Sequence, residues 1–240
     1  MDDASIRHPS DASEDPSSRL RRSESWQART LAHVEAALPG AEVTVHGSAR
    51  DPADLDPWSD LDVRIVLDAP VDVEAVLGAP IWAFQHSRTD GRTVVRTVVR
   101  TVLVDGRAVD LSVDGGPVVL PETAPDGAIR FDAALAASRF GRGSELIGLH
   151  LTLGIVRETL VQGMLLADRR EGTDHHRFAM AQDARARETL AVVDGPLTPR
   201  TALAAYLQYG RWRRELDPSY RPDATGLEAL IRRGNGGRIG

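Results

Sequence analysis

Cysteine is absent from the 240 residues of this chain. Disulfides, thiolate zinc sites and cysteine nucleophiles are therefore excluded. Lysine is absent as well, because every residue counted as lysine or arginine is an arginine. This excludes a Schiff-base lysine and a P-loop lysine, and it leaves arginine, whose planar guanidinium binds phosphate through two hydrogen bonds, as the strong phosphate ligand. Biased codon usage explains the missing lysine more simply than selection for phosphate binding does.

Positive charge and long apolar runs are also scarce. The net charge of −6 argues against non-specific binding of nucleic acid, which needs a basic face, and suits a neutral or cationic partner. The N-terminus has no apolar segment typical of a signal peptide, and the most apolar stretch, 146–167, is interrupted by His150, Arg157, Glu158 and Gln162. We therefore expect a cytoplasmic protein that binds neither nucleic acid nor a membrane. The oligomeric state stays open.

Apolar patterning divides the chain into three parts. Residues 1–22 are rich in Asp, Ser, Pro and Arg and contain few apolar residues. They bury too little apolar surface to offset the entropy lost on ordering, so we expect a disordered tail. Up to residue 120, strand-like alternation and helical spacing follow one another, whereas the segments after residue 121 carry helical spacing. The expected fold class is α+β: a mixed β-sheet with flanking helices over 23–120, followed by a C-terminal helical bundle over 121–240.

Spacing and turn residues predict the elements of the first part. A helix runs from Trp26 to Leu38 and ends at Pro39-Gly40. Short helices are expected directly after Asp51-Pro52 and over 71–77. Strands are expected over 42–46, 61–67, 81–86, 93–104 and 107–113, with Asp105-Gly106 as the hairpin turn between the last two.

The second part is expected to consist of helices over 128–140, 144–169, 174–193, 198–216 and 225–233. In the long second helix, one apolar stripe predicts a bundle core: Leu146, Leu149, Leu153, Val156, Leu160 and Met164. In the helix over 198–216, Tyr206, Tyr209 and Trp212 are expected to pack inward, with the charged residues Arg211, Arg213, Arg214 and Glu215 on a solvated face. An aromatic-lined pocket is the alternative there.

The chemistry-bearing motif is His46-Gly47-Ser48, followed after a loop by Ser59-Asp60-Leu61-Asp62. The glycine allows backbone to approach a phosphate, and Asp60 and Asp62, two residues apart, share one face of a strand. Asp110, inside a later strand, can complete a group of oxygen ligands suited to magnesium. Such a group neutralises charge in nucleotidyl transfer and helps to deprotonate the attacking hydroxyl. The alternative is that these acids are an ordinary solvated strand face.

This succession of motifs resembles the nucleotidyltransferase superfamily of the DNA polymerase β type. The modest size and helical second half are most similar to the small-molecule branch, the aminoglycoside and lincosamide nucleotidyltransferases. The resemblance covers about residues 28–113. It implies that Gly47 and Ser48 hold the triphosphate of ATP, that Asp60 and Asp62 bind two magnesium ions, and that Asp110 is the third carboxylate.

Ser59 and Arg50 are assigned to the nucleotide site on the same resemblance. The chain departs from the family at Arg50-Asp51-Pro52, where a glycine is frequent, and in a loop up to Ser59 that is about one residue longer. Family members often place a lysine on the phosphates. Arg50, Arg64 and Arg142 are the candidates to replace it, and the sequence does not rank them.

For other polar residues of the helical part, the sequence gives weaker support for a role in the site. Glu145 opens the long helix and can orient or deprotonate an acceptor hydroxyl, although an acid in a first turn is also favoured by the helix dipole. His150 and Glu158 are either acceptor contacts or ordinary helix positions. The run Asp174-His175-His176-Arg177 is not expected to bind metal, because adjacent histidines on a helix diverge, whereas zinc helices space them four apart.

The sequence thus predicts a magnesium- and ATP-dependent enzyme that transfers AMP to a hydroxyl of a small molecule, for instance an aminoglycoside-type antibiotic. In this reading residues 23–120 are the catalytic domain and residues 121–240 bind the acceptor. The alternative is a non-catalytic protein of nucleotidyltransferase fold that acts as a regulator or antitoxin. Addition of nucleotides to nucleic-acid ends is disfavoured by the negative charge.

Overall fold

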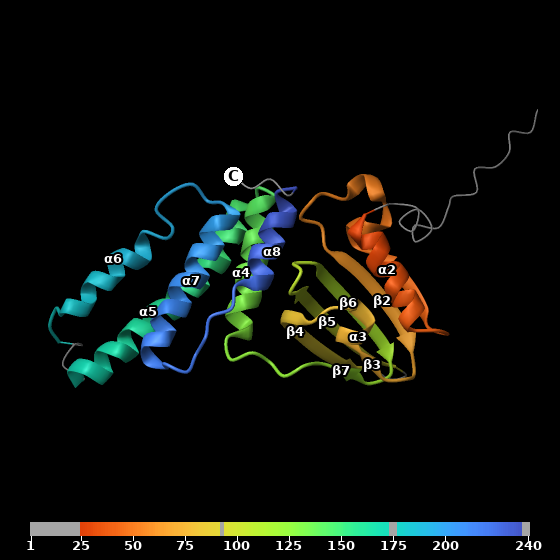
Figure 1. Ribbon diagram of the computed structural model, residues 1–240, viewed down its shortest axis with the longest axis horizontal. Coiled ribbons are helices and arrows are strands. Elements are labelled where there is room, and N and C mark those ends of the chain that lie inside the picture. Colours follow the sequence, from red (N-terminus) through yellow and green to blue (C-terminus); the bar gives the residue numbers. More distant parts are fainter. Residues whose placement is uncertain (1–24, 92–93, 173–176, 237–240) are drawn as a thin grey trace, which may run out of the picture.

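A computed structural model describes residues 25–91, 94–172 and 177–236. The predicted tail over 1–22 and the run Asp174-His175-His176 lie outside the described residues. The described part is elongated, with a β-sheet toward one end and a helical bundle toward the other (Figure 1). The predicted α+β fold, a mixed sheet with flanking helices followed by a helical bundle, is confirmed.

The main sheet has five strands in the order β1-β2-β6-β5-β4. Their bounds are β1 Glu42–His46, β2 Leu61–Leu67, β4 Ile81–Asp90, β5 Val95–Leu103 and β6 Ala108–Gly115. The neighbours β2 and β6 are parallel and the other pairs antiparallel, so the sheet is mixed as predicted. Two short strands, β3 Val71–Asp72 and β7 Val118–Val119, pair separately.

The two faces of the sheet differ in polarity because side chains alternate along each strand. On β2, Leu61, Val63 and Ile65 are buried in a core shared with α2 (Trp26–Ala37) and α3 (Val73–Leu77). The intervening Asp62 and Arg64 point to the opposite face and are only partly buried. The polar face of the sheet is therefore the one available to a ligand.

Two short helices were predicted wrongly in detail. The segment over 71–77 is strand β3 followed by α3, whose N-cap Asp72 accepts a hydrogen bond from the backbone of Ala75 at 3.2 Å. After β1 the chain forms two 3-10 turns, η1 Gly47–Arg50 and η2 Pro52–Asp54, where one helix beginning at Asp51-Pro52 was expected. Asp51 does accept from the backbone of Ala53, as a capping residue would.

The helical part consists of α4 Gly127–Gly141, α5 Glu145–Glu171, η4 Ala181–Asp183, α6 Ala184–Leu190, α7 Pro199–Leu216 and α8 Thr225–Gly234. The helix predicted over 174–193 is wrong in extent, because within the described residues helical structure begins only at Ala181 and α6 ends at Leu190. Phe178 and Leu190 are 70% and 65% exposed, so this segment lacks the packed apolar face that stabilises a long helix.

Buried aromatic residues join the helical bundle to the sheet. Trp82 of β4 lies in one core with residues of α4 and α8, and its indole N–H donates to the carbonyl of Asp223 at 2.9 Å. Asp126, before α4, accepts hydrogen bonds from the hydroxyls of Tyr206 and Tyr220 at 2.8 and 2.6 Å. The inward packing predicted for Tyr206, Tyr209 and Trp212 is confirmed, with exposed fractions of 0%, 3% and 1%.

The predicted core stripe of α5 is wrong for most of its length. Leu146, Leu153 and Met164 are 84%, 46% and 50% exposed, and Leu160 is also exposed. The face that is buried consists mainly of small and polar residues: Gly148, Thr152, Ile155, Val156, Thr159, Gly163, Leu166 and Ala167.

This face of α5 is buried because its small residues allow aromatic rings of neighbouring helices to pack closely against it. A Cβ at Gly148 would lie 2.6 Å from the ring of Phe140, and one at Gly163 would lie 2.8 Å from the ring of Trp212. The hydroxyls of Thr152 and Thr159 donate to carbonyl oxygens one turn earlier, at 2.8 and 2.9 Å. Their polar atoms are thus satisfied inside the helix, and their methyl groups pack as apolar surface.

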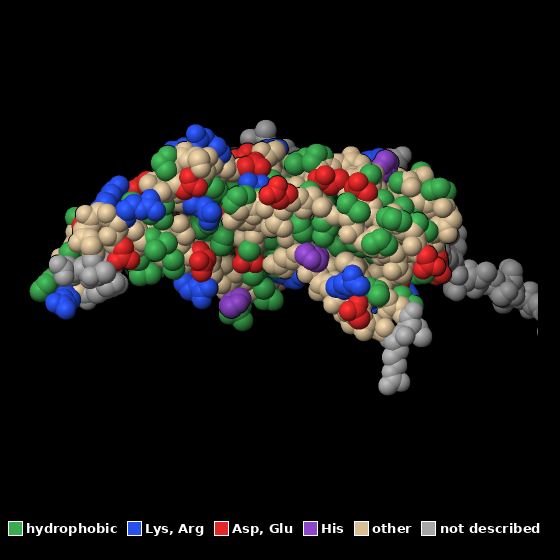
Figure 2. Space-filling view, turned by 90° about the horizontal axis from the view of Figure 1, so that it is seen from below, with side chains coloured by type: hydrophobic (Ala, Val, Ile, Leu, Met, Phe, Trp, Pro, Cys, Tyr) green, Lys and Arg blue, Asp and Glu red, His purple; other side chains and the backbone are tan. Residues whose placement is uncertain are grey.

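No helix in the described ranges combines the length and apolar character needed to cross a membrane. Figure 2 shows acidic and basic side chains interspersed along the lower face of the molecule. Among the side chains coloured there, no continuous basic strip runs along this face.

Candidate functional site

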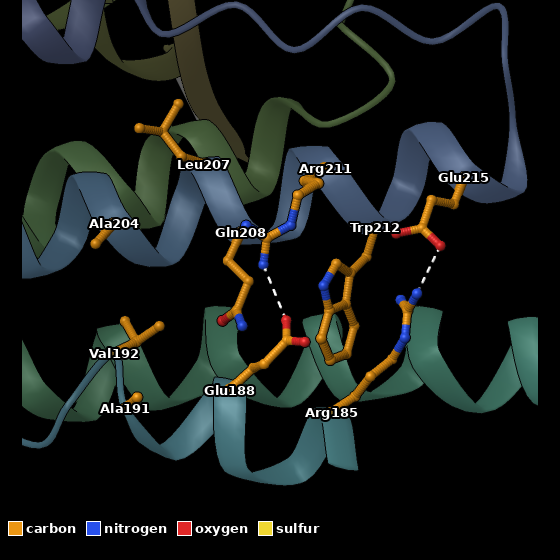
Figure 3. A pocket seen from close by; sticks show the side chains of 10 residues that line it. All are labelled: Arg185, Glu188, Ala191, Val192, Ala204, Leu207, Gln208, Arg211, Trp212 and Glu215. Atoms are coloured by element: carbon orange, nitrogen blue, oxygen red, sulfur yellow. Dashed lines mark hydrogen bonds and ion pairs between the residues drawn. The ribbon is translucent and has the colours of Figure 1, made fainter. Parts of the chain in front are cut away.

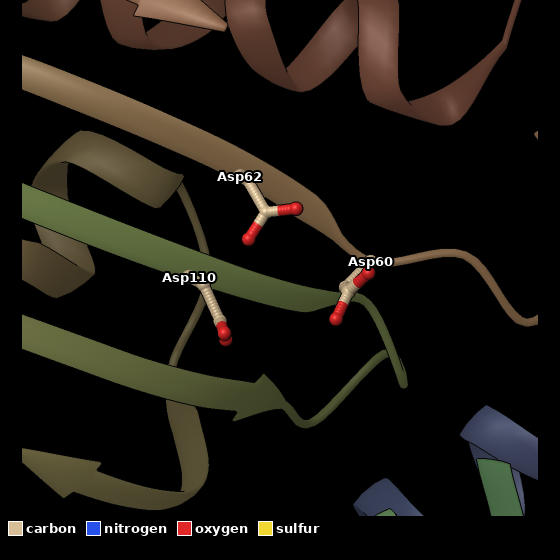
Figure 4. A group of neighbouring side chains, drawn as sticks. All are labelled: Asp60, Asp62 and Asp110. Atoms are coloured by element: carbon tan, nitrogen blue, oxygen red, sulfur yellow. The ribbon is translucent and has the colours of Figure 1, made fainter. Parts of the chain in front are cut away.

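Three aspartates meet at one end of β2 and β6. The parallel register of these strands places Asp62 directly beside Asp110, and Asp60 immediately precedes β2. Each residue offers one carboxylate oxygen, and these oxygens all lie within 4.8 Å of one another (Figure 4). The structure thus brings together the three carboxylates that the sequence singled out.

The site carries excess negative charge. Burial, with the nearby carboxylates of Asp60 and Asp110, raises the pKa of Asp62 from 3.8 to about 6, although Arg100 and Arg142 oppose this. Among the described residues, the side chain of Asp62 has no hydrogen-bond or ion-pair partner. Since a carboxylate with a raised pKa and no protein partner gains from a nearby cation, this donor set fits a divalent metal ion.

Arg100 is a site residue that the sequence analysis missed. It is the register partner of Asp110 on β5, its Nε donates to Oδ2 of Asp110 at 2.8 Å, and its guanidinium lies over the ring of Phe131. Burial raises the pKa of Asp110, and the hydrogen bond from Arg100 opposes this. The predicted turn Asp105-Gly106 would place Asp110 opposite Thr101, whereas the pairs in the structure are symmetric about Asp105, so Arg100 faces Asp110.

In the Gly47-Ser48 turn, Gly47 lies directly against the carboxylate of Asp62. Gly47 has a φ of +60°, and a Cβ there would lie 2.1 Å from Oδ2 of Asp62. Only glycine fits this position without moving the carboxylate. Ser48 follows in η1 and is half-buried, and its hydroxyl makes no hydrogen bond to a described residue. The turn therefore brings backbone next to Asp62, where we expect the triphosphate from the sequence.

The loop that carries Asp60 is anchored on the helical bundle. The ring of Trp58 fills a notch between Gly141 of α4 and Gly234 of α8, since a Cβ at either glycine would come within 2.4 Å of the ring. Ser59 is buried, and its hydroxyl accepts the backbone N–H of Asp56 at 3.0 Å. The hydroxyl of Ser59 thus stabilises the loop, and its contact with a nucleotide stays a prediction.

The structure separates the three arginine candidates. Arg142 lies beside the carboxylates, with its Nε 3.1 Å from Oδ2 of Asp56 and its Nη2 4.0 Å from Oδ1 of Asp60. Arg64 is paired with Asp114, farther along the sheet. Arg50 is exposed and contacts no described residue by hydrogen bond or ion pair. Among the described residues, Arg142 and Arg100 have guanidinium nitrogens within 4.0 Å of a carboxylate oxygen of Asp60 or Asp110.

A narrow pocket of about 40 Å³ lies between the carboxylates and α4. Its lining includes Asp60, Asp110, Arg100, Phe131 and Arg142.

The acids and the histidine proposed from α5 do not line this pocket. Glu145 is exposed in the first turn of α5, and His150 is exposed as well. Glu158 forms an ion pair with its neighbour Arg157 at 2.9 Å. A role for these three residues in acceptor binding stays a prediction.

A larger groove of about 740 Å³ lies between α6 and α7 (Figure 3). Charged side chains that line it pair with each other: Arg185 with Glu215 at 2.6 Å and Arg211 with Glu188 at 3.1 Å. Figure 1 places α6 at the end of the molecule away from the sheet. The groove thus belongs to the helical bundle and contributes nothing to the carboxylate site.

No protein family and no curated protein matches this sequence. Among solved structures, a match is the crystal structure of an aminoglycoside 6-adenyltransferase from Bacillus subtilis. The two chains are 11% identical, the alignment covers 89% of this chain and 98% of the other, and the TM-score is 0.30. Similarity of this extent establishes neither a shared site nor a shared activity.

Proposed function

We propose that the protein is a nucleotidyltransferase that moves AMP from ATP to a hydroxyl group of a small molecule, with Mg²⁺ bound at Asp60, Asp62 and Asp110. The observation that carries the proposal is the meeting of these carboxylates, at the positions that the nucleotidyltransferase resemblance requires. Ordinary acids on a solvated strand face would pair with arginines or point to water. Asp62 instead sits beside two like charges, and its carboxylate has no partner among the residues that the structure describes.

In the proposed reaction, the residues of the site would have distinct roles. Asp60 and Asp62 would hold the metal, and Asp110 would complete the ligand set and accept the proton of the attacking hydroxyl. A metal bound there would supply charge neutralisation at the transferred phosphate and would lower the pKa of the hydroxyl. Arg100 orients Asp110 through the hydrogen bond from its Nε.

The phosphates of ATP would lie on the Gly47-Ser48 turn, where a Cβ at Gly47 would lie 2.1 Å from Oδ2 of Asp62. Arg142 and Arg100 would contact the phosphates and replace the lysine that the chain lacks. Arginine is suited to this because its fork of N–H groups binds phosphate oxygens in pairs. The ring of Phe131 under Arg100 limits the directions that its guanidinium can take.

Transfer of label from ATP carrying a radioactive α-phosphate tests the proposal. The protein is incubated with Mg²⁺ against a panel of hydroxyl compounds that includes aminoglycosides, lincosamides, sugars, sugar phosphates and tRNA. The proposal expects a labelled small molecule and equimolar pyrophosphate, lost in Asp60→Asn and Asp62→Asn. Asp194→Asn, on an exposed loop after α6, is the control that keeps full activity.

Two results would contradict the proposal: transfer that persists in both carboxylate variants, and label found on tRNA alone. Failure to bind Mg²⁺ and ATP at all would favour the alternative of a non-catalytic protein of this fold. An aminoglycoside-type acceptor is a prediction from the negative net charge, and the panel tests it directly.

A further inference from the structure

The polar face of the sheet continues past the carboxylates. Arg64 follows Asp62 by two residues on β2, and Asp114 follows Asp110 by four residues on β6. Arg96 of β5 is the register partner of Asp114. With a rise of about 3.3 Å per residue, this second cluster lies roughly 7–13 Å from the carboxylates along the strands.

One buried carboxylate orients two guanidinium groups in this cluster. The side chain of Asp114 is 4% exposed, whereas those of Arg64 and Arg96 are 40% and 49% exposed. Oδ2 of Asp114 accepts from Nε and Nη2 of Arg64, at 2.8 and 2.6 Å. Arg96 donates from Nε to Oδ1 at 2.6 Å and from Nη2 to Oδ2 at 2.9 Å. Hydrogen bonds from Arg96 and Arg64 lower the pKa of Asp114 to about 2, so it stays ionised.

In this arrangement, guanidinium N–H groups and positive charge stay available to a ligand. Two guanidinium groups share one carboxylate, so the cluster carries a net positive charge. Each guanidinium has five N–H groups, and in neither arginine does Nη1 bond to a described residue. A cavity of about 460 Å³ lies beside the cluster and is lined by both arginines and Asp114. A structural ion pair needs one arginine, whereas two held in fixed orientation beside a cavity suit an anion.

We propose that Arg64 and Arg96 form a binding subsite for a phosphate group carried by the acceptor. The assignment to the acceptor rests on the proposed function, while phosphate binding by the pair does not. The Gly47-Ser48 turn adjoins the start of β2, whereas Arg64 is the middle residue of β2, beyond Asp62, and Arg96 pairs with Asp114 near the C-terminal end of β6. A triphosphate on the turn and an acceptor on the arginine pair would thus meet at the carboxylates from opposite sides. Charges farther from the arginine pair than a Debye length of about 8–10 Å are largely screened. The positive charge of the pair therefore outweighs the net charge of the chain at this position, which favours an anionic acceptor over an aminoglycoside.

Titration with inorganic phosphate tests the subsite itself. In metal-free wild-type protein, the Nε–H NMR signals of Arg64 and Arg96 can be followed, because we expect their hydrogen bonds to Asp114 to slow exchange with water. We expect both signals to shift saturably with phosphate, and Arg96→Gln to weaken binding about tenfold. Arg88→Gln is the matched control, because Arg88 also pairs with one aspartate, at 3.0 Å, but on the opposite face of the sheet. Signals that do not move, or equal affinity in Arg96→Gln, would overturn the subsite.

Transfer kinetics test the assignment to the acceptor. A sugar and its phosphate ester with the same free hydroxyl are compared as acceptors. We expect the wild type to have a lower KM for the ester, and Arg96→Gln to remove this preference with little change in KM for ATP. An increase in the KM for ATP alone would show that the pair binds the nucleotide, and the assignment would be wrong. If phosphate binds but no acceptor takes up AMP, the proposed function fails while the subsite stands.

Discussion

Replacing Asp62 by asparagine should stabilise the metal-free protein, although it removes a proposed metal ligand. The pKa of Asp62 is raised from 3.8 to about 6, so its ionised form is penalised in the folded state. The full displacement corresponds to about 3 kcal/mol, because one pKa unit is about 1.4 kcal/mol. The side chain is only partly buried, so solvent screening reduces the expected gain to roughly 1–2 kcal/mol. Asparagine keeps the size of the side chain, and no hydrogen bond to a described residue is lost.

The dependence on pH follows from the sign of the shift. Between the unfolded value of 3.8 and the folded value of about 6, the folded state holds more protons than the unfolded state. The free energy of unfolding of the wild type therefore falls as the pH rises through this window. The advantage of Asp62→Asn should be full above pH 6, shrink between about 6 and 4, and vanish below that range.

Thermal and urea unfolding in the presence of a chelator measure this advantage. At a pH of about 7.5, we expect the melting temperature of Asp62→Asn to lie roughly 2–8 °C above that of the wild type. Asp114→Asn is the control of opposite sign, because Asp114 is ion-paired and its pKa is lowered. Equal or lower stability of Asp62→Asn at neutral pH would refute the reasoning about clustered charge.

Further substitutions test the turn and the buried network. Gly47→Ala should displace the carboxylate of Asp62 and abolish nucleotide transfer with unchanged far-UV circular dichroism, since its Cβ would lie 2.1 Å from Oδ2. Gly40→Ala is its control, because Gly40 also has a positive φ, of 89°, but no described atom within 4 Å of a Cβ, so it should lose stability and keep activity. Tyr206→Phe removes the buried hydroxyl that bonds to Asp126, and urea unfolding should show a loss of about 1–3 kcal/mol without a change in the KM for ATP. An unchanged stability would show that the hydroxyl contributes nothing.

The sheet could be predicted well because local signals agree there. Strands β1 and β2 have the predicted bounds, 42–46 and 61–67, since alternating apolar residues are delimited by glycine, proline and aspartate. The pairing of Asp62 with Asp110 is a matter of register between strands far apart in sequence. No local pattern contains it, and the resemblance to a family supplied it.

The buried face of α5 could not be predicted from hydrophobicity, because packing space decided it. A leucine stripe normally marks the core, but Phe140 and Trp212 need room that only Gly148 and Gly163 provide. The threonines on the same face count as polar in any pattern, although their hydroxyls are satisfied within the helix. Arg100 was missed for a simpler reason, since its contact with the site depends on pairing across the hairpin.

Binding of Mn²⁺, used in place of Mg²⁺ as a paramagnetic probe, tests the central claim most directly. Electron paramagnetic resonance of the full chain with ATP would count the bound ions. We predict that, in the presence of ATP, the wild type and Asp194→Asn bind Mn²⁺ and Asp62→Asn binds little or none. Equal Mn²⁺ binding by the wild type and Asp62→Asn, or none by the wild type, would contradict a metal site at Asp60, Asp62 and Asp110.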